Sequence, residues 1–208
     1  GNPTRDQLGT AVAELEGGSG GIITCTGLAA ITLVLASLPS GAHVVAPHDC
    51  YGGTYRLLSA FSRQGTLPVD FIDQGDPAAL RAALAKEPDL LWIETPSNPL
   101  LRIVDIQAVS AAAHAVGALV LADNTFLSPA LQRPLELGAD LVLHSTTKYI
   151  NGHSDVVGGA VIAKDAELHQ QLTWWANALG LTGSPFDSFL TLRGLRTLDA
   201  RLRVHQEN

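Results

Sequence analysis

The sequence has no methionine, only two cysteines, no long apolar run and no cluster of basic residues. No run approaches the ~18 apolar residues of a membrane span, so we expect no membrane crossing. A formal net charge of −7 argues against a nucleic-acid-binding surface. Cys25 and Cys50 have neither CxxC nor zinc-ligand spacing, which predicts small buried or half-buried thiols, no metal site and a reducing, cytoplasmic compartment.

The absence of methionine includes the first position, where the chain has Gly1. At the other end, residues 201–208 have the pattern of a helix that lacks a C-terminal cap. We therefore expect the chain to be a piece of a longer protein. Its 208 residues suffice for one domain with a substantial core, and no internal repeat or low-complexity linker divides them.

Short apolar runs alternate with helical patterns along the whole chain. Hydrophobic residues make up 46% and charged residues 16%, which fits a buried sheet covered on both faces. The alternation predicts an α/β fold with a doubly wound, mostly parallel seven-stranded sheet flanked by helices. Strands are expected at residues 22–25, 43–47, 69–73, 90–94, 118–123, 140–143 and 156–163. Helices are expected at residues 4–16, 26–38, 76–86, 105–116 and 165–178, with a short one after residue 126 and a last one from about residue 186. In the first helix, the apolar residues Leu8, Val12 and Leu15 are expected to share the face that packs inward.

Two polar side chains stand at the ends of successive predicted strands. Asp123 ends the strand at 118–123, and Lys148 follows the strand at 140–143, with the hydroxyls of Ser145 and Thr147 beside it. Open α/β sheets place their ligands at such strand ends. A lysine that forms a Schiff base, with an aspartate that keeps a pyridine nitrogen protonated, suits pyridoxal phosphate chemistry. Taken singly, a lysine after a strand is usually a solvated loop residue, and an aspartate there is often a helix N-cap.

Three further positions fit a cofactor site, and two of them have a plainer alternative. Gly27 opens a helix whose first N–H groups suit an anion, although an ordinary strand-to-helix turn has the same pattern. Tyr51 precedes two glycines, so its ring can lie on a flat cofactor or pack on its own loop. Asn98 stands in a proline-stiffened loop and is expected to be held in place.

A different motif points to hydrolase chemistry. Residues 17–21 match G-x-S-x-G, with Ser19 in the nucleophile position. The nucleophile elbow requires a strand before the motif and a helix after it. Here the predicted helix comes first and the strand second, which argues against a nucleophilic Ser19.

Taken together, the motifs resemble the Cys/Met-metabolism family of pyridoxal-phosphate enzymes. They occur in the family's order and span essentially the whole chain, at residues 1–4, 26–30, 51–54, 94–99, 123–125 and 145–155. The resemblance implies that residues 1–208 form the large, cofactor-binding domain of a fold-type I enzyme. It also implies that an N-terminal arm and a C-terminal domain are absent from this piece.

The resemblance also implies roles for individual residues. Lys148 would be the Schiff-base lysine and catalytic base, and Tyr51 a catalytic residue that stacks on the ring. The family usually has methionine where Leu28 stands, but only the backbone is needed there. The other cofactor-binding residues would be Asp123 at the pyridine nitrogen, Gly27, Leu28, Ser145 and Thr147 at the phosphate, Asn98 near the phenolic oxygen and the substrate carboxylate, and Thr125 on the other ring face.

Residues 123–132 and 174–189 look most like those family members that join an O-acyl-homoserine to cysteine, giving cystathionine for methionine biosynthesis by transsulfuration. Lyases that cleave cystathionine at its γ- or β-carbon, O-acylhomoserine sulfhydrylases and a non-enzymatic cofactor-binding fragment are the alternatives. The family's phosphate-binding Tyr-x-Arg pair comes from a neighbouring subunit, and its substrate-binding arginine from the C-terminal domain. We therefore expect a homotetramer built from dimers that share active sites.

Overall fold

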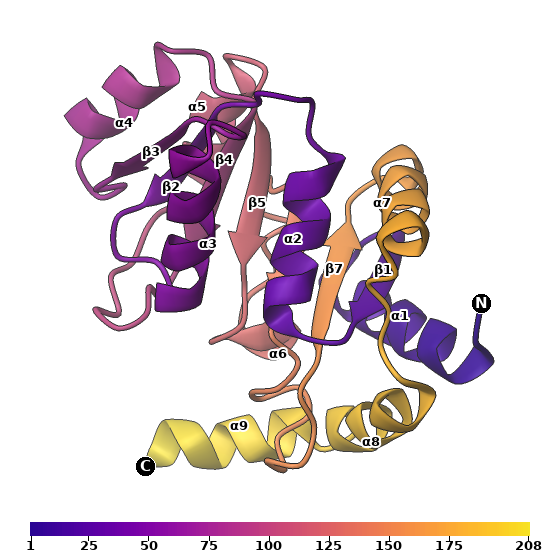
Figure 1. Ribbon diagram of the computed structural model, residues 1–208. Coiled ribbons are helices and arrows are strands. Elements are labelled where there is room, and N and C mark those ends of the chain that lie inside the picture. Colours follow the sequence, from indigo (N-terminus) through magenta and orange to yellow (C-terminus); the bar gives the residue numbers. More distant parts are fainter.

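The computed structural model describes all residues from 1 to 208. A seven-stranded sheet lies between two layers of helices (Figure 1). The strand order is β1-β7-β6-β5-β4-β2-β3, and only β7 runs antiparallel to its neighbours, β1 and β6. The strands are β1 (Gly20–Thr24), β2 (Val44–Pro47), β3 (Val69–Ile72), β4 (Leu90–Glu94), β5 (Leu119–Asp123), β6 (Leu141–His144) and β7 (Gly159–Ala163). The predicted α/β class and the mostly parallel seven-stranded sheet are confirmed.

Most helices begin at a side chain that accepts hydrogen bonds from the free N–H groups of the first turn. The capping residues are Asn2, Thr26, Asp76, Asp105, Asp165 and Ser184. The helices are α1 (Pro3–Glu16), α2 (Gly27–Ser37), α3 (Gly52–Arg63), α4 (Pro77–Leu84), α5 (Ile106–His114), α6 (Ser128–Leu131), α7 (Ala166–Leu179), α8 (Pro185–Leu195) and α9 (Leu198–Glu207). None of them combines the length and the apolar character that a membrane crossing requires.

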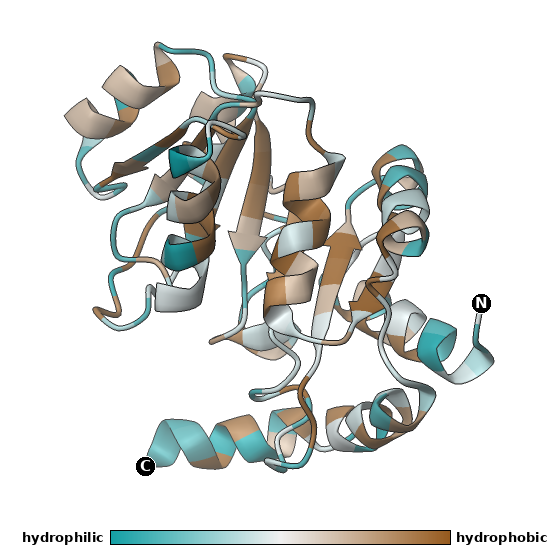
Figure 2. Cartoon of the chain, in the orientation of Figure 1, coloured by the Kyte–Doolittle hydropathy of each residue, from teal (hydrophilic) through white to brown (hydrophobic).

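The sheet is buried on both faces because successive side chains of a strand point to opposite sides. On β5, Val120 and Ala122 join a core formed with α1 and α5, whereas Leu121 joins a core formed with α2 and α7. In Figure 2 the strands in the middle are hydrophobic, and the hydrophilic residues lie mainly on the outer helices and loops. Little space remains for polar side chains within the sheet, so they gather at the strand ends.

Parallel register brings several strand ends to one edge of the sheet. Glu94, the last residue of β4, pairs with Asp123, the last residue of β5, and Asp123 pairs with Leu143 of β6. Helices α8 and α9 run across this end, below the tip of β5 (Figure 1). From α9, Arg201 donates to the carbonyl oxygen of Tyr149 at 2.7 Å, which fixes the loop after β6 against the helix.

The predicted and the observed secondary structure differ at three places. Helix α3 was not predicted, because Gly52 and Gly53 indicate a turn although they begin a helix with an apolar face. The last strand begins at Gly159 rather than at residue 156. The final helical segment divides into α8 and α9.

Two expected burial states also differ. Cys50 is buried, but Cys25 is exposed. Leu15 is 36% exposed, because the buried stripe of α1 runs from Leu8 through Val12 to Glu16. A hydrophobic pattern selects Leu15 for the core, whereas the helix turns a carboxylate inward at its last position.

The packing of β5 yields a stability prediction. Leu121 is fully buried at the centre of the sheet, so Leu121→Ala should lower the free energy of unfolding by about 2–5 kcal/mol in urea titrations. Leu179 at the end of α7 is 45% exposed, so Leu179→Ala should change it by only about 0.5 kcal/mol. Equal losses in the two variants would contradict the assignment of the core.

Candidate cofactor site

Two carboxylates close neighbouring strands at the carboxyl edge of the sheet. Asp123 Oδ1 accepts hydrogen bonds from Thr125, at 2.6 Å from the hydroxyl and 3.0 Å from the backbone nitrogen. Burial raises the pKa of Asp123, and these hydrogen bonds oppose the rise. Burial and then the charge of Asp123 raise the pKa of Glu94 to about 8. A cationic group beside Asp123 would offset this concentration of buried negative charge.

Thr125 connects Asp123 to the loop that follows β6. Its hydroxyl donates to Asp123 and accepts from the backbone N–H of Ser145 at 2.9 Å. Ser145 in turn packs against Gly27, where an added Cβ would lie 3.0 Å from the Ser145 Cβ. Glycine at position 27 therefore lets the start of α2 approach Ser145. The chain of contacts leads from a carboxylate at one end to a helix N-terminus at the other.

The start of α2 has the properties of an anion site. Thr26 caps the helix by accepting from the backbone nitrogen of Ala29 at 2.8 Å. The N–H groups of Gly27 and Leu28 lie in the first turn and have no intrahelical acceptor. The helix dipole adds positive potential there, and the Ser145 hydroxyl lies alongside. A phosphate fits this cradle of donors.

Thr147 is oriented differently from Ser145. Its hydroxyl accepts from the backbone nitrogen of Gly158 at 3.0 Å and donates to the carbonyl oxygen of Gly158 at 3.2 Å. It thereby joins the Lys148 loop to the start of β7. A contact from Thr147 to a phosphate stays a prediction, and its proton would have to turn away from Gly158 to make it.

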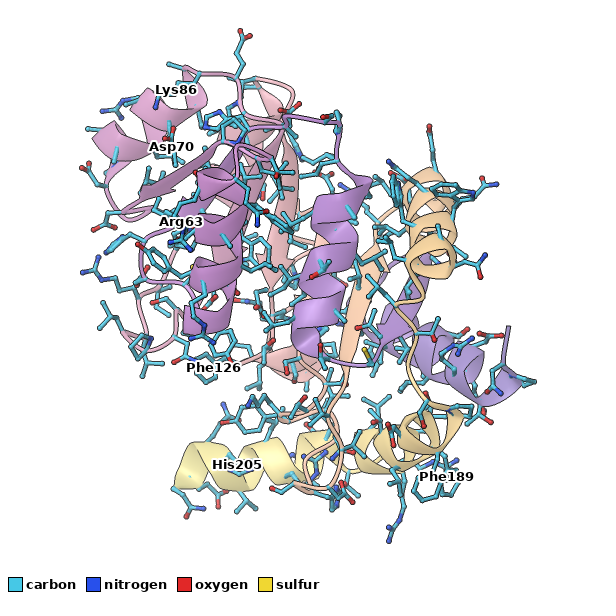
Figure 3. All side chains as sticks on the ribbon, viewed as in Figure 1. Arg63, Asp70, Lys86, Phe126, Phe189 and His205 are labelled. Atoms are coloured by element: carbon cyan, nitrogen blue, oxygen red, sulfur yellow. The ribbon has the colours of Figure 1, made fainter.

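Lys148 has an exposed side chain on a loop whose backbone is fixed. Its own backbone nitrogen donates to Ser145 at 3.2 Å. Elsewhere, Lys86 forms an ion pair with Asp70 at 2.7 Å. Figure 3 shows that pair at one end of the sheet, whereas Phe126, which directly follows Thr125, lies at the other. The amine of Lys148, in contrast, has no acidic partner within ion-pair distance.

Tyr51 and Asn98 are brought together by Glu94, a residue to which the sequence motifs gave no role. The Glu94 carboxylate accepts from the backbone nitrogens of Tyr51 and Asn98, both at 2.9 Å. The ring of Tyr51 lies over Gly53, and the residue is still 45% exposed. Tyr51 therefore packs on its own loop and keeps a surface free for a flat partner. The strand-end position of Glu94, which matches that of Asp123, was the signal that could have identified it.

A hollow of about 350 Å³ adjoins this cluster on the side away from Lys148. Asp49 and Arg102 line it together with Glu94. Within it, the hydroxyl of Ser97 donates to Asp49 at 2.6 Å, and Arg102 forms an ion pair with Asp73 at 2.7 Å. The charged groups of the hollow thus pair with other protein groups. The hollow borders the candidate cofactor site, and Glu94 lines both.

The geometry fits a flat cofactor with a cationic ring nitrogen at one end and a phosphate at the other. Asp123 suits the nitrogen, the start of α2 and Ser145 suit the phosphate, and Lys148 lies on the loop that follows Ser145. These features define the class of pyridoxal-phosphate enzymes that hold the cofactor through a lysine. The sequence pattern of the Cys/Met metabolism PLP-dependent enzymes matches residues 1–208, and the chain belongs to this family.

Comparison with known proteins gives relatives of several activities within this family. The chain is 60% identical to the cystathionine gamma-synthase of Escherichia coli strain K12 and 46% identical to the cystathionine beta-lyase of Coxiella burnetii, each over 209 residues. The crystal structure of cystathionine gamma synthase from Xanthomonas oryzae pv. oryzae in complex with cystathionine is 70% identical, with a TM-score of 0.98. Each comparison covers all of this chain and 54% of the relative, so the chain spans about half the length of these proteins.

The lysine assignment is tested by covalent trapping. Borohydride reduction of the cofactor-loaded protein, followed by peptide mass spectrometry, should place the label on Lys148. Lys86 is engaged by Asp70, and Lys164 follows the antiparallel strand β7 and so lies at the opposite edge of the sheet. Lys148→Ala should abolish the label. A label on Lys86 or Lys164 would refute the assignment.

The raised pKa of Glu94 predicts how stability depends on pH. From an ordinary value of 4.5 to its folded pKa of about 8, the folded protein retains a proton that the unfolded chain releases. Stability should therefore fall as pH rises through this range. Glu94→Gln cannot titrate but keeps an acceptor oxygen for Tyr51 and Asn98. Its unfolding free energy in the cofactor-free protein should consequently fall less than that of the wild type between about pH 5 and pH 8.

The matched control for this experiment is Glu14→Gln. Glu14 is exposed, so the same chemical change should leave the pH dependence of the wild type intact. Urea titrations at a series of pH values measure all three proteins. Parallel curves for Glu94→Gln and the wild type would contradict the raised pKa.

Proposed function

We propose that residues 1–208 form the pyridoxal-phosphate-binding domain of an enzyme that joins an O-acyl-homoserine to cysteine, giving cystathionine. The continuous path from Asp123 through Thr125 and Ser145 to the start of α2 is the observation that carries the cofactor site. The choice of reaction is supported by higher identity to the E. coli and Xanthomonas γ-synthases, 60% and 70%, than to the Coxiella β-lyase, 46%. The Xanthomonas enzyme was solved in complex with cystathionine, the product that we propose.

In this proposal the two ends of the cofactor are held by opposite kinds of charge. The ionised Asp123 binds the protonated ring nitrogen. The positive charge on this nitrogen offsets the cost of burying the Asp123 carboxylate. The N–H groups of Gly27 and Leu28 bind the phosphate with the hydroxyls of Ser145 and Thr147. Thr125, which already bridges Asp123 and Ser145, lies against one ring face. Tyr51 stacks on the other face.

When bound through Lys148, pyridoxal phosphate supplies a sink for the electrons released at the substrate Cα. The freed Lys148 amine takes the Cα proton and later returns it. Asp123 holds the ring nitrogen protonated throughout, which keeps the sink effective. At Cγ the bond to the acyl carboxylate breaks and a bond to the cysteine sulfur forms. Asn98, whose backbone Glu94 fixes, lies near the substrate carboxylate.

Other activities of the family share most of these residues. A cystathionine γ- or β-lyase would use the same Lys148 and Asp123, and an O-acylhomoserine sulfhydrylase would differ in the thiol it admits. A fragment that binds cofactor without turnover is the non-enzymatic alternative. The homotetramer with shared active sites stays a prediction from the resemblance, and the cytoplasmic location stays a prediction from the cysteine content.

The deciding experiment supplies the natural-length protein with an O-acyl-homoserine, with and without cysteine. Cystathionine and keto acid are quantified separately, because a lyase diverts its substrate to keto acid and ammonia. We expect cystathionine to form only when cysteine is present and to exceed the keto acid, since the site must exclude water from the unsaturated substrate. Rapid cleavage of added cystathionine with negligible synthesis would instead establish a lyase.

A further inference from the structure

A fully buried carboxylate lies beneath the candidate site. Glu16 is the last residue of α1, and its side chain has 0% exposure. Its Oε1 accepts from His144 Nε2 at 2.6 Å and from Asn124 Nδ2 at 2.9 Å. A negative charge at a helix C-terminus opposes the helix dipole, and burial adds a desolvation cost. The two donors are therefore essential to hold this carboxylate.

The partners of Glu16 are the direct chain neighbours of the two candidate cofactor anchors. Asn124 follows Asp123, and His144 precedes Ser145. One oxygen of Glu16 thus binds the side chains of two residues, Asn124 next to Asp123 and His144 next to Ser145. Glu16 contacts neither anchor itself.

The network extends across three strand ends. Asn124 Nδ2 also donates to the carbonyl oxygen of Gln132 at 2.8 Å, and Gln132 Nε2 donates to Asn124 Oδ1 at 3.0 Å. Gln132 Nε2 reaches the carbonyl oxygen of Thr95, just after β4, at 3.1 Å. The side chains beneath the site therefore link the ends of β4, β5 and β6.

The network is not optimised for stability alone. Glu16 Oε2 and His144 Nδ1 are buried and have no hydrogen-bond partner in the chain. Buried polar atoms without partners destabilise a fold, and apolar side chains of similar volume would avoid that cost. Burial raises the pKa of Asp123, and His144 lowers that pKa when its ring is protonated. We therefore look for the role of these contacts in the position of Asp123 and Ser145 and in the charge around Asp123.

We propose that Glu16 is a positioning residue of the cofactor site, which sets the separation of Asp123 and Ser145 by binding Asn124 and His144. This inference rests on the proposed cofactor site. Without the carboxylate, the two strand ends lose their common acceptor, and the anchors no longer match the two ends of one rigid ligand. Cofactor affinity is then lost in a protein that still folds.

The test compares variants of the natural-length protein. Apo-protein is titrated with pyridoxal phosphate, and the absorbance of the lysine-bound cofactor gives the dissociation constant. By analogy with groups that orient metal ligands, Glu16→Leu, which removes the acceptor oxygen shared by Asn124 and His144, should weaken binding by roughly 10-fold or more. Glu14→Leu makes the same chemical change on the exposed side of α1 and should bind as the wild type does.

A second pair of variants covers the possibility that Glu16→Leu does not fold. His144→Leu removes the donor to Glu16 and should weaken binding, whereas His144→Gln offers an amide donor of similar reach and should restore much of it. Circular dichroism and urea unfolding of the apo-proteins report folding separately from affinity. The positioning role is supported only if affinity falls in a folded variant.

The contrary outcomes are distinct. Dissociation constants within about twofold of the wild type in the folded variants would overturn the positioning role, since twofold is only about 0.4 kcal/mol. Failure of both Glu16→Leu and His144→Leu to fold would assign the network to stability alone and would also overturn the positioning role. Wild-type protein that binds no cofactor, or binds it on another lysine, would overturn the cofactor site itself.

Discussion

The parallel register of β4, β5 and β6 is the constraint on which the site depends. Because their strands are buried on both faces, polar side chains are excluded from the sheet interior and appear where the strands end. Register then decides which ends meet, and it sets Glu94 beside Asp123. The short loops that follow carry Asn98, Thr125 and Ser145 to the same edge. A shift of one strand by one residue would separate these side chains and turn its apolar residues to the wrong face.

The charges at this edge form two opposed regions. Carboxyl groups of Glu94, Asp123 and Glu16 gather at the ends of β4 and β5 and beneath them, and burial raises the pKa of the first two. The first turn of α2 supplies donors and positive potential only a few contacts away. A rigid ligand with a cation at one end and an anion at the other matches both regions at once. The distance between Asp123 and the start of α2 changes if the end of β5 or β6 moves. The Glu16 contacts that hold these strand ends therefore matter as much as the contacts of the site itself.

The sequence was sufficient to predict the features that depend on local pattern. Apolar runs indicated the strands, and Asp123 and Lys148 could be proposed as site residues because they stand where those runs end. Helix α3 was not predicted because the two glycines at its start indicate a turn. The roles of Glu94 and Glu16 depend on tertiary contacts, and Glu16 meets His144 across 128 residues of chain. The apolar periodicity moreover assigned a core position to Leu15, whereas in the structure the packing of α1 against the sheet places Glu16 inside.

The loop that carries Lys148 is held from both ends of the chain. Glu16 of α1 binds His144 at its start, and Arg201 of α9 donates to the carbonyl oxygens of Tyr149, directly after the lysine, and of Gly194 in α8. Desolvation lowers the pKa of Arg201, so the protein bears the cost of burying charge on each flank of the loop. Between these supports the lysine side chain is exposed. A fixed backbone with a free amine is the arrangement required of a residue that first holds a cofactor and then moves protons beside it.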